Sequence, residues 1–226
     1  MTRNRANLLS YLFIIAAVGV AAFLYPGLPD PIPSHWNMHG EVDGYTSKLW
    51  GVTILPLSAI LVFVVMRLIP VISPKGYRTE SFANVLHIFQ VTIVGFTSLV
   101  AILVLLEAKD INVYINKVIY GALGALFIVM GNYFGKIRKN FFLGVRTPWT
   151  LASDEVWART HRLAGRLFVL LGVFMLAGIF VTLQPWLLIG MIVVIALVPV
   201  LYSYWLYRRV EGFGDKDGGD FGDRVD

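Results

Sequence analysis

Six long apolar segments constrain this chain more than any other feature of its sequence. Each segment lacks Asp and Glu, and a helix needs about 20 mainly apolar residues to cross a bilayer. The segments are apolar on all sides, whereas the strands of a membrane barrel alternate apolar and polar residues. The sequence therefore predicts an all-α membrane protein with six transmembrane helices. These are residues 8–25, 51–72, 85–106, 113–135, 163–183 and 186–207.

Composition supports this fold class and excludes several kinds of protein. Apolar residues make up 57% of the chain and charged residues only 15%, while soluble domains carry about a quarter charged residues. The chain has no cysteine, which excludes disulfide scaffolds, iron–sulfur clusters and cysteine-based zinc sites. The net charge is +5, but the basic residues are dispersed along the membrane edges. Direct binding of nucleic acid is therefore not expected, because it needs basic residues gathered on one soluble face.

Basic residues mark alternate ends of the predicted helices. The amino end carries Arg3 and Arg5, and the loop 136–162 carries six basic residues. The loop 26–50 has only Lys48 against three acids. Because cytoplasmic loops are enriched in Lys and Arg, both termini and the loop 136–162 are predicted to be cytoplasmic, and the loop 26–50 is predicted to be extracellular.

The same segments divide the chain into predicted modules. Residues 1–84 form an amino-terminal module with two transmembrane helices and the outer loop 26–50. Residues 85–207 form a four-helix carboxy-terminal module that includes the cytoplasmic loop 136–162. The tail 208–226 is rich in Gly and Asp, and we expect it to be acidic and disordered.

The outer loop holds the first group of residues with chemical potential. Three prolines stiffen its entry, and glycines then allow tight turns. The loop is either a plain folded cap on the membrane or a structured surface that recognises a ligand. The residues that would carry recognition are His35, Asn37, Gly40, Asp43 and Lys48.

A metal site is the alternative interpretation of this loop. His35, His39 and Asp43 follow one another at intervals of four residues, which on a helix would place all three on one face. Gly40 and the preceding prolines argue against a regular helix there. We therefore treat the three residues as candidate ligands only, and we expect no cofactor.

The loop 136–162 and its flanks form the second group. Ser153 is predicted to cap a helix that begins at Asp154, with Glu155 and Arg159 paired one turn apart. Before it, the sequence at 146–149 predicts an irregular turn. The region is a topogenic basic loop with aromatic anchors, an anion site at the helix start, or a docking surface for a cytoplasmic partner. The docking residues would be Asn140, Arg146, Thr147, Pro148, Trp149, Trp157, His161 and Arg162.

Polar residues inside the predicted helices form the third group. His87 and Gln90 lie one turn apart in the third helix, and with Asn132 they could line a relay or a small polar cavity. The plainer interpretation is hydrogen bonding between helices. Gly131 and Gly135 have the small-xxx-small spacing that permits close helix approach. No carboxylate lies well inside a predicted helix, which disfavours a proton-coupled carrier.

Two stretches of the sequence resemble the SdpI family of membrane proteins. Residues 28–48, LPDPIPSHWNMHGEVDGYTSK, resemble that family's amino-terminal module. Residues 131–165, GNYFGKIRKNFFLGVRTPWTLASDEVWARTHRLAG, resemble its carboxy-terminal module and are the more specific match. Together with the six predicted helices, the resemblance covers nearly the whole chain.

The resemblance implies a multi-pass protein of a bacterial or archaeal cell membrane. The family's namesake protects cells against a secreted, membrane-active toxin peptide and holds an ArsR-type repressor at the membrane. By this resemblance we expect an immunity and signal-transduction protein rather than an enzyme. Its implied partners are the lipid bilayer, a toxin peptide outside and an ArsR-type repressor inside. The alternatives from the residues alone are a membrane-embedded metal-dependent enzyme that uses the outer-loop histidines, and a small-solute transporter.

Overall fold

The computed structural model describes residues 1–37, 41–77, 79–111, 113–181 and 183–212. Among these residues, six helices are long and apolar enough to cross a membrane, which confirms the predicted all-α fold. They are α1 (Arg3–Leu24), α2 (Lys48–Ile72), α3 (Ala83–Ala108), α4 (Ile115–Phe134), α6 (Asp154–Ala177) and α7 (Pro185–Val210).

Shorter elements lie in the connections between these helices. The 3-10 turn η1 (Tyr25–Gly27) follows α1 and leads to two antiparallel strands, β1 (Ile32–Trp36) and β2 (Val42–Thr46). A second 3-10 turn, η2 (Thr79–Phe82), precedes α3, and the five-residue helix α5 (Pro148–Ala152) precedes α6. The strand pair, which we call the hairpin, was not predicted from the sequence. The irregular turn predicted at residues 146–149 is wrong in part. A short helix, α5, begins there with Pro148 at its first position, where proline is favoured.

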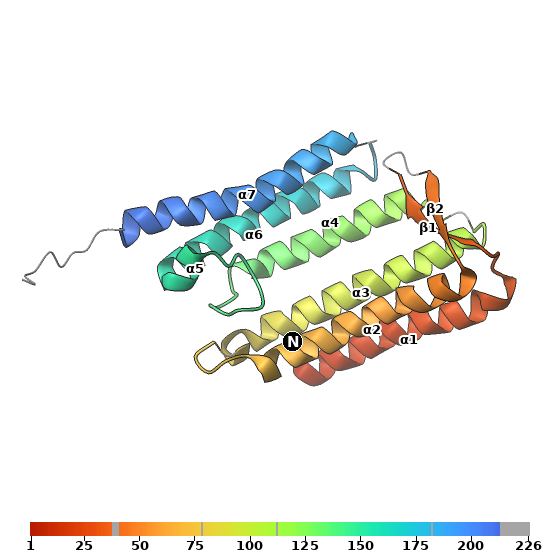
Figure 1. The fold of residues 1–226 in the computed structure, drawn as a ribbon, viewed down its shortest axis with the longest axis horizontal. Helices are drawn as coiled ribbons and strands as arrows, with labels where there is room; N and C mark the ends of the chain where they lie inside the picture. The colour runs from red at the N-terminus through yellow and green to blue at the C-terminus, as the bar shows by residue number, and fades with distance from the viewer. Residues whose placement is uncertain (38–40, 78, 112, 182, 213–226) are drawn as a thin grey trace, which may run out of the picture.

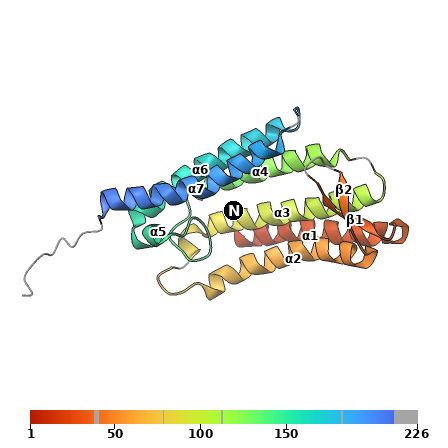
Figure 2. The same cartoon turned by 45° about the horizontal axis from the view of Figure 1, so that its top comes forward.

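The long helices form two groups of three that lie side by side (Figure 1). The first group is α1, α2 and α3, the second is α4, α6 and α7, and the groups meet through α3 and α4. A second view shows the same separation (Figure 2). The module boundary predicted at residue 84 stays a prediction. In the packing, α3 belongs with α1 and α2, so the two helix groups divide after α3 rather than before it.

The two ends of the bundle carry different structures. The hairpin lies at one end, and the N-terminus, α5 and the end of α7 lie at the other (Figure 1). By the predicted orientation of the basic residues, the hairpin end faces outward and the α5 end faces the cytoplasm. We call them the outer end and the cytoplasmic end, and the names rest on that prediction.

Large apolar side chains cover the outside of the bundle. Phe180, for example, is 86% exposed, and α1, α2 and α7 each present several exposed Leu, Ile, Val or aromatic residues. Water disfavours so extensive an apolar surface, whereas lipid tails are a suitable solvent for it. The exposure pattern therefore agrees with helices that face a bilayer.

Glycines bring α4 and α6 into backbone contact. A Cβ atom placed on Gly131 would lie 2.6 Å from the carbonyl oxygen of Gly165, and one on Gly165 would lie 2.6 Å from that of Gly131. Two turns further, Gly124 and Gly172 meet in the same way, at 2.9 and 2.7 Å. The close approach predicted from Gly131 is confirmed, and the order of the contacts makes α4 and α6 antiparallel. Gly135 packs differently, since its absent side chain leaves room for the stem of Arg162.

The start of α6 follows the predicted capping pattern. The Ser153 hydroxyl accepts a hydrogen bond from the N–H of Val156, and Asp154 and Glu155 occupy the first turn. The Arg159 guanidinium lies 2.6 Å from the Glu155 carboxylate. The helix therefore begins at Asp154 as predicted, well before the apolar run 163–183, and its first turns extend the bundle at the cytoplasmic end.

Candidate functional site

The hairpin presents polar side chains at the outer end. Ile32 pairs with Thr46 and Trp36 pairs with Val42, while the register shifts on both sides of His35, which lies opposite Gly44. A Cβ atom on Gly44 would lie 2.8 Å from the Cβ of His35. Real side chains do not approach so closely, so this irregular register requires a glycine at position 44.

Two polar pairs span the strands beside this irregularity. The Nδ1 atom of His35 lies 2.5 Å from the carboxylate of Asp43, and both side chains are exposed. The Asn37 side chain donates to the Glu41 carboxylate at 2.9 Å and accepts from the Glu41 N–H at 3.0 Å. Each pair fixes two side chains that would otherwise move independently, so the hairpin offers an ordered polar surface.

Apolar and polar contacts anchor the hairpin to the bundle. Ile32 is fully buried and packs in a cluster with Leu24, Leu28 and Leu105, from α1, its following turn and α3. It also fills the space beside Gly51 of α2, where any side chain would collide with it. At the start of α2, the backbone N–H of Lys48 donates to the Asp30 carboxylate at 3.1 Å. The polar surface is therefore held on a rigid base.

The part of the chain that the structure describes contains no complete set of ligands for the metal site considered above. Within it, no three His, Asp or Glu side chains gather closely enough to hold a metal ion. His35 and Asp43 do meet, but as a cross-strand pair and not along one helix face. His39 and Gly40 lie outside the described residues.

At the cytoplasmic end, Asn140 organises the segment 135–147, which we call the basic loop. Its side-chain amide donates to the carbonyls of Arg138 and Leu143, at 2.8 and 3.1 Å. Its oxygen accepts from the N–H groups of Phe142 and Leu143, at 2.8 and 2.7 Å. Asn140 is fully buried, so these bonds replace the water that loop backbone groups otherwise need. The loop is consequently folded around one side chain.

His161 and Trp157 of α6 hold the basic loop from the other side. The N–H of Val145 donates to Nε2 of His161 at 3.1 Å, and Nδ1 of His161 lies 2.8 Å from the Trp157 carbonyl. A backbone N–H can only donate and a carbonyl can only accept, so the histidine is the neutral tautomer with its proton on Nδ1. The two rings stack at 4.0 Å between centroids. Gly144 has a φ of +104°, and any side chain there would collide with His161.

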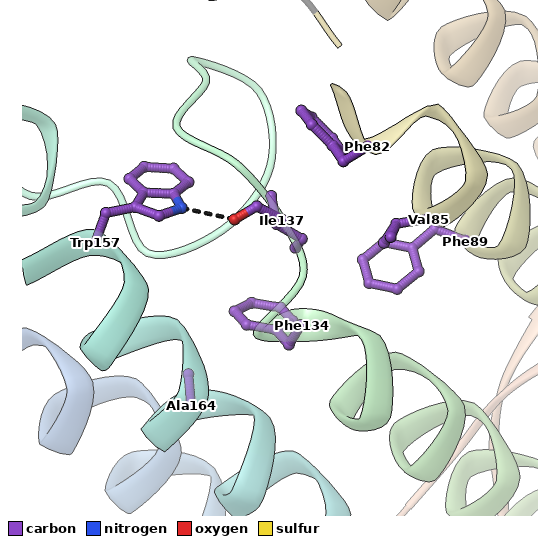
Figure 3. Packing of buried hydrophobic residues seen from close by; sticks show 7 residues of the cluster. All are labelled: Phe82, Val85, Phe89, Phe134, Ile137, Trp157 and Ala164. Carbon is purple, nitrogen blue, oxygen red and sulfur yellow. Dashed lines mark hydrogen bonds between the residues drawn. The ribbon is translucent and has the colours of Figure 1, made fainter. Parts of the chain in front are cut away.

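The Trp157 indole also ties α6 to the base of α4. Its Nε1–H donates to the carbonyl of Ile137 at 2.8 Å, the bond drawn in Figure 3. The same buried cluster includes Phe134 at the end of α4, Phe82 of η2 and Phe89 of α3 (Figure 3). The basic loop therefore packs against both helix groups.

Hydroxyl groups connect α5 to α7. Thr147 and Thr150 form a reciprocal capping box at the start of α5. The Thr147 hydroxyl also lies 3.0 Å from that of Ser203 in α7, and all three residues are buried. Trp149 packs edge-on against Tyr204 at 5.0 Å. α5 is thereby fixed against α7.

The intramembrane polar residues do not form the common site that the sequence allowed. Nδ1 of His87 lies 3.1 Å from the carbonyl of Met1, and the Gln90 amide donates to the Ser10 hydroxyl at 3.0 Å. Gln90 thus bonds α3 to α1, and His87 bonds α3 to the residue range that precedes α1. Asn132 instead lies beside α6 and donates to the carbonyl of Ile128 in its own helix. The relay that the sequence allowed is therefore not formed by these three residues, and the transporter hypothesis loses the observation that motivated it.

Comparison with known proteins finds similarity to the SdpI family. The model of the SdpI/YfhL protein family matches residues 136–203, and that of a domain of unknown function, DUF1648, matches residues 12–60. The Immunity protein SdpI of Bacillus subtilis (strain 168) is 24% identical over 217 residues, which are 92% of this chain and 99% of that protein. The chain is therefore similar to SdpI-family proteins in both halves of its sequence. No solved structure matches it.

The matched segments coincide with the two ordered polar regions. The DUF1648 match contains η1, the hairpin strands and the start of α2. The SdpI match begins in the basic loop at Lys136 and ends at Ser203, the α7 residue that contacts Thr147. The similarity to SdpI and the six apolar helices together make the chain a multi-pass protein of the cell membrane.

Burial divides the docking residues predicted in the SdpI segment into two kinds. Half of them are buried and hold the loop in shape: Asn140, Thr147, Trp157 and His161. The rest are reachable from outside: Arg146, Pro148 and Arg162 are exposed, and Trp149 is half-buried. The guanidinium of Arg146 donates to the carbonyl of Phe141, which orders it at the loop surface. Of the predicted docking residues, only these four are available for direct contact with a partner.

Several residues that shape these regions were not predicted as site residues from the sequence. Glu41 has a weak signal, since it follows Asn37 by four residues in a turn-rich loop. Thr150 has a clearer one, because a hydroxyl three residues after Thr147 fits a capping box. Ser203 could have been found as a lone polar residue within an apolar helix. Gly144 could not, because only the folded loop reveals its positive φ.

Proposed function

We propose that this protein is an immunity and signalling receptor that binds a membrane-active toxin peptide at its outer end and an ArsR-type repressor at its cytoplasmic end. The observation that carries the proposal is that two ordered polar regions lie at opposite ends of one bundle (Figure 1). The whole-length similarity to a protein named as an immunity protein supports the same role. An anchor alone would need neither ordered region.

The outer end suits a peptide that is both polar and apolar. The His35–Asp43 and Asn37–Glu41 pairs give fixed hydrogen-bonding groups. Tyr45 on β2 and Trp50 at the start of α2 are 62% and 63% exposed. Aromatic rings beside ordered polar groups are the usual composition of a recognition surface. A membrane-active peptide presents both kinds of surface and lies at this depth.

The cytoplasmic end suits a soluble protein partner. Arg146, Pro148 and Trp149 form the accessible edge of α5 and the basic loop. Their support is rigid, because α5 is bonded to α7 and the loop is bonded to α6. Arg and Trp are the residues most often found at the energetic centre of protein interfaces. We therefore assign repressor docking to this edge.

α3 gives a physical route between the two ends. Near its outer end Leu105 packs with Ile32 of the hairpin, and near its cytoplasmic end Phe89 packs in the cluster that contains Ile137 and Trp157. A peptide that binds one arrangement of the hairpin more tightly than another would shift α3 and hence the basic loop. Such differential binding is what a receptor needs.

Survival of cells challenged with peptide tests the outer role. Sensitive cells that express the protein should survive a panel of membrane-depolarising peptides better than empty-vector cells. The double variant His35→Ala, Asp43→Ala should lose this advantage, with apparent affinity reduced about tenfold or more by the missing hydrogen-bonding groups. Lys117→Ala serves as the matched control, because Lys117 is exposed at the same end but lies on α4. Equal killing of all strains across the panel would contradict the proposal.

Membrane recruitment tests the cytoplasmic role separately. ArsR-type repressors of the source organism, each fused to a fluorescent protein, are followed before and after peptide is added. Arg146→Ala should abolish recruitment and leave survival unchanged. A repressor that stays in the cytoplasm with the unmodified protein would remove the signalling half and retain the immunity half.

A further inference from the structure

A groove runs between α4 and α6 near the cytoplasmic end, on the outside of the bundle. Its floor consists of Gly131, Gly135 and Gly165, which lack side chains at the place where the helices touch. The groove has a volume of about 600 Å³ and is open on one side. The glycines at which the two backbones pack closely therefore also line a surface depression.

Two arginines and an amide border this groove. Arg162 and Arg166 lie one turn apart on α6, and Asn132 faces them from α4. All three are exposed. The Asn132 amide has two N–H donors, and one of them serves the Ile128 carbonyl. Donors thus converge on the groove from both helices.

The two arginines differ from neighbouring basic residues in their electrostatic surroundings. Arg159 pairs with Glu155 and Lys139 pairs with Asp154. Among the residues that the structure describes, neither Arg162 nor Arg166 pairs with a carboxylate. Two adjacent guanidinium groups repel each other, so their placement on one groove favours an anion between them.

Depth in the membrane limits what this anion can be. The 20 residues of α4 span about 30 Å, the thickness of the hydrocarbon core. Asn132 lies in the last turn of α4, and Arg166 borders the same groove, one helical turn deeper along α6 than Arg162. Arginines at this level extend toward the lipid headgroups. A headgroup phosphate is the anion that is always present there.

The rest of the groove is apolar. Val169 and Leu170 continue the α6 face beyond Arg166, away from the cytoplasmic end. The groove therefore has a basic part near the membrane surface and an apolar part toward the membrane centre. A phospholipid has the same order of groups along its length.

We propose that this groove binds one anionic phospholipid of the cytoplasmic leaflet. Its phosphate lies between Arg162 and Arg166, with the Asn132 amide as a further donor, and one acyl chain lies on Val169 and Leu170. The space for the chain is the open volume of the groove, which lies beside the glycine contact of the two helices. This site is separate from the hairpin and from the exposed edge of α5.

Native mass spectrometry of the detergent-purified full chain tests this site. The probes are phosphatidylglycerol, phosphatidylcholine with identical acyl chains, and inorganic phosphate. We expect one phosphatidylglycerol to bind about tenfold or more tightly than phosphatidylcholine, because both lipids carry a phosphate but only one has net charge. Arg162→Gln, Arg166→Gln should remove this preference. The control variant Arg208→Gln, Arg209→Gln should keep the preference, because these residues do not line the groove. It is a matched control since that pair is exposed at the same end and carries the same charge.

Four results would contradict the proposal. Equal affinity of the unmodified protein for the two lipids would remove the charge argument. A preference that persists in Arg162→Gln, Arg166→Gln would place the lipid elsewhere. Inorganic phosphate that displaces phosphatidylglycerol would indicate a free-anion site. Leu170→Trp keeps both arginines and fills the apolar part, so unchanged lipid occupancy in this variant would contradict the predicted position of the acyl chain.

Discussion

Two asparagines near each other in sequence illustrate how much a residue's role depends on its surroundings. Asn140 is fully buried and makes four hydrogen bonds to the backbone of the basic loop. Asn132 is exposed on α4 and donates to a carbonyl of its own helix. The same side chain therefore folds a loop in one place and borders a groove in the other.

The stability of variants at these two positions should differ clearly. Asn140→Ala leaves several buried backbone groups without partners, and we expect it to lower the free energy of unfolding by about 2–4 kcal/mol. Asn132→Ala removes no buried partner and should change it by less than about 0.5 kcal/mol. Thermal unfolding in detergent, followed by circular dichroism, compares the two. Similar losses in both variants would show that Asn140 does not hold the loop.

At the residue scale, the chemistry of several positions was predictable but their burial was not. The sequence singled out Trp157 and His161 as docking candidates on the capped helix that begins at Asp154. It could not show that Val145 and Ile137, from a loop without regular structure, would supply their partners. Periodicity describes one element at a time, and these bonds join two elements.

The α4–α6 pair is the clearest case at the scale of elements. Gly124 and Gly131 of α4 meet Gly172 and Gly165 of α6. Along each helix the two glycines are seven residues apart, which is about two helical turns, so the contacts repeat on one face of the helix. In a membrane, close van der Waals packing of this kind replaces the hydrophobic effect as the cause of helix association.

Alanine substitution of glycine tests this packing. Gly131→Ala would place Cβ against the Gly165 carbonyl and the Val169 backbone. The helices must then separate, and we expect a loss of about 1–3 kcal/mol in unfolding free energy. Gly190→Ala in α7 is the matched control, because no atom lies within 4 Å of the added Cβ. It should be neutral or stabilise by up to about 1 kcal/mol, since alanine is the better helix former. Equal effects of the two substitutions, measured by the same unfolding assay, would contradict the packing account.

At the scale of the whole molecule, the question is which end of the bundle faces the cytoplasm. The basic residues predict that both termini and the basic loop lie inside and that the hairpin lies outside. The structure is consistent with this because the hairpin and the basic loop occupy opposite ends (Figure 2). Orientation in the membrane itself stays a prediction.

Thiol labelling in intact cells tests this orientation. The sequence contains no cysteine, so single cysteines can be introduced without first replacing native ones. Tyr45→Cys on β2 should react with a membrane-impermeant maleimide in intact cells. Arg138→Cys in the basic loop should react only after permeabilisation; both positions are exposed in the fold. The reverse pattern would exchange the outer and cytoplasmic ends and remove the basis of the proposed function.

The sequence alone determined the six membrane helices, the start of α6 and the close packing at Gly131. These depend on apolar length, on local capping and on the absence of a side chain, all of which are properties of short segments. Only the tertiary structure decided that residues 32–36 pair with residues 42–46, that His87 and Gln90 bond to residues 1 and 10, and that the basic loop closes on α6. Each of these features joins residues that are distant in sequence or lack periodicity, so their partners become known only when the helices are packed.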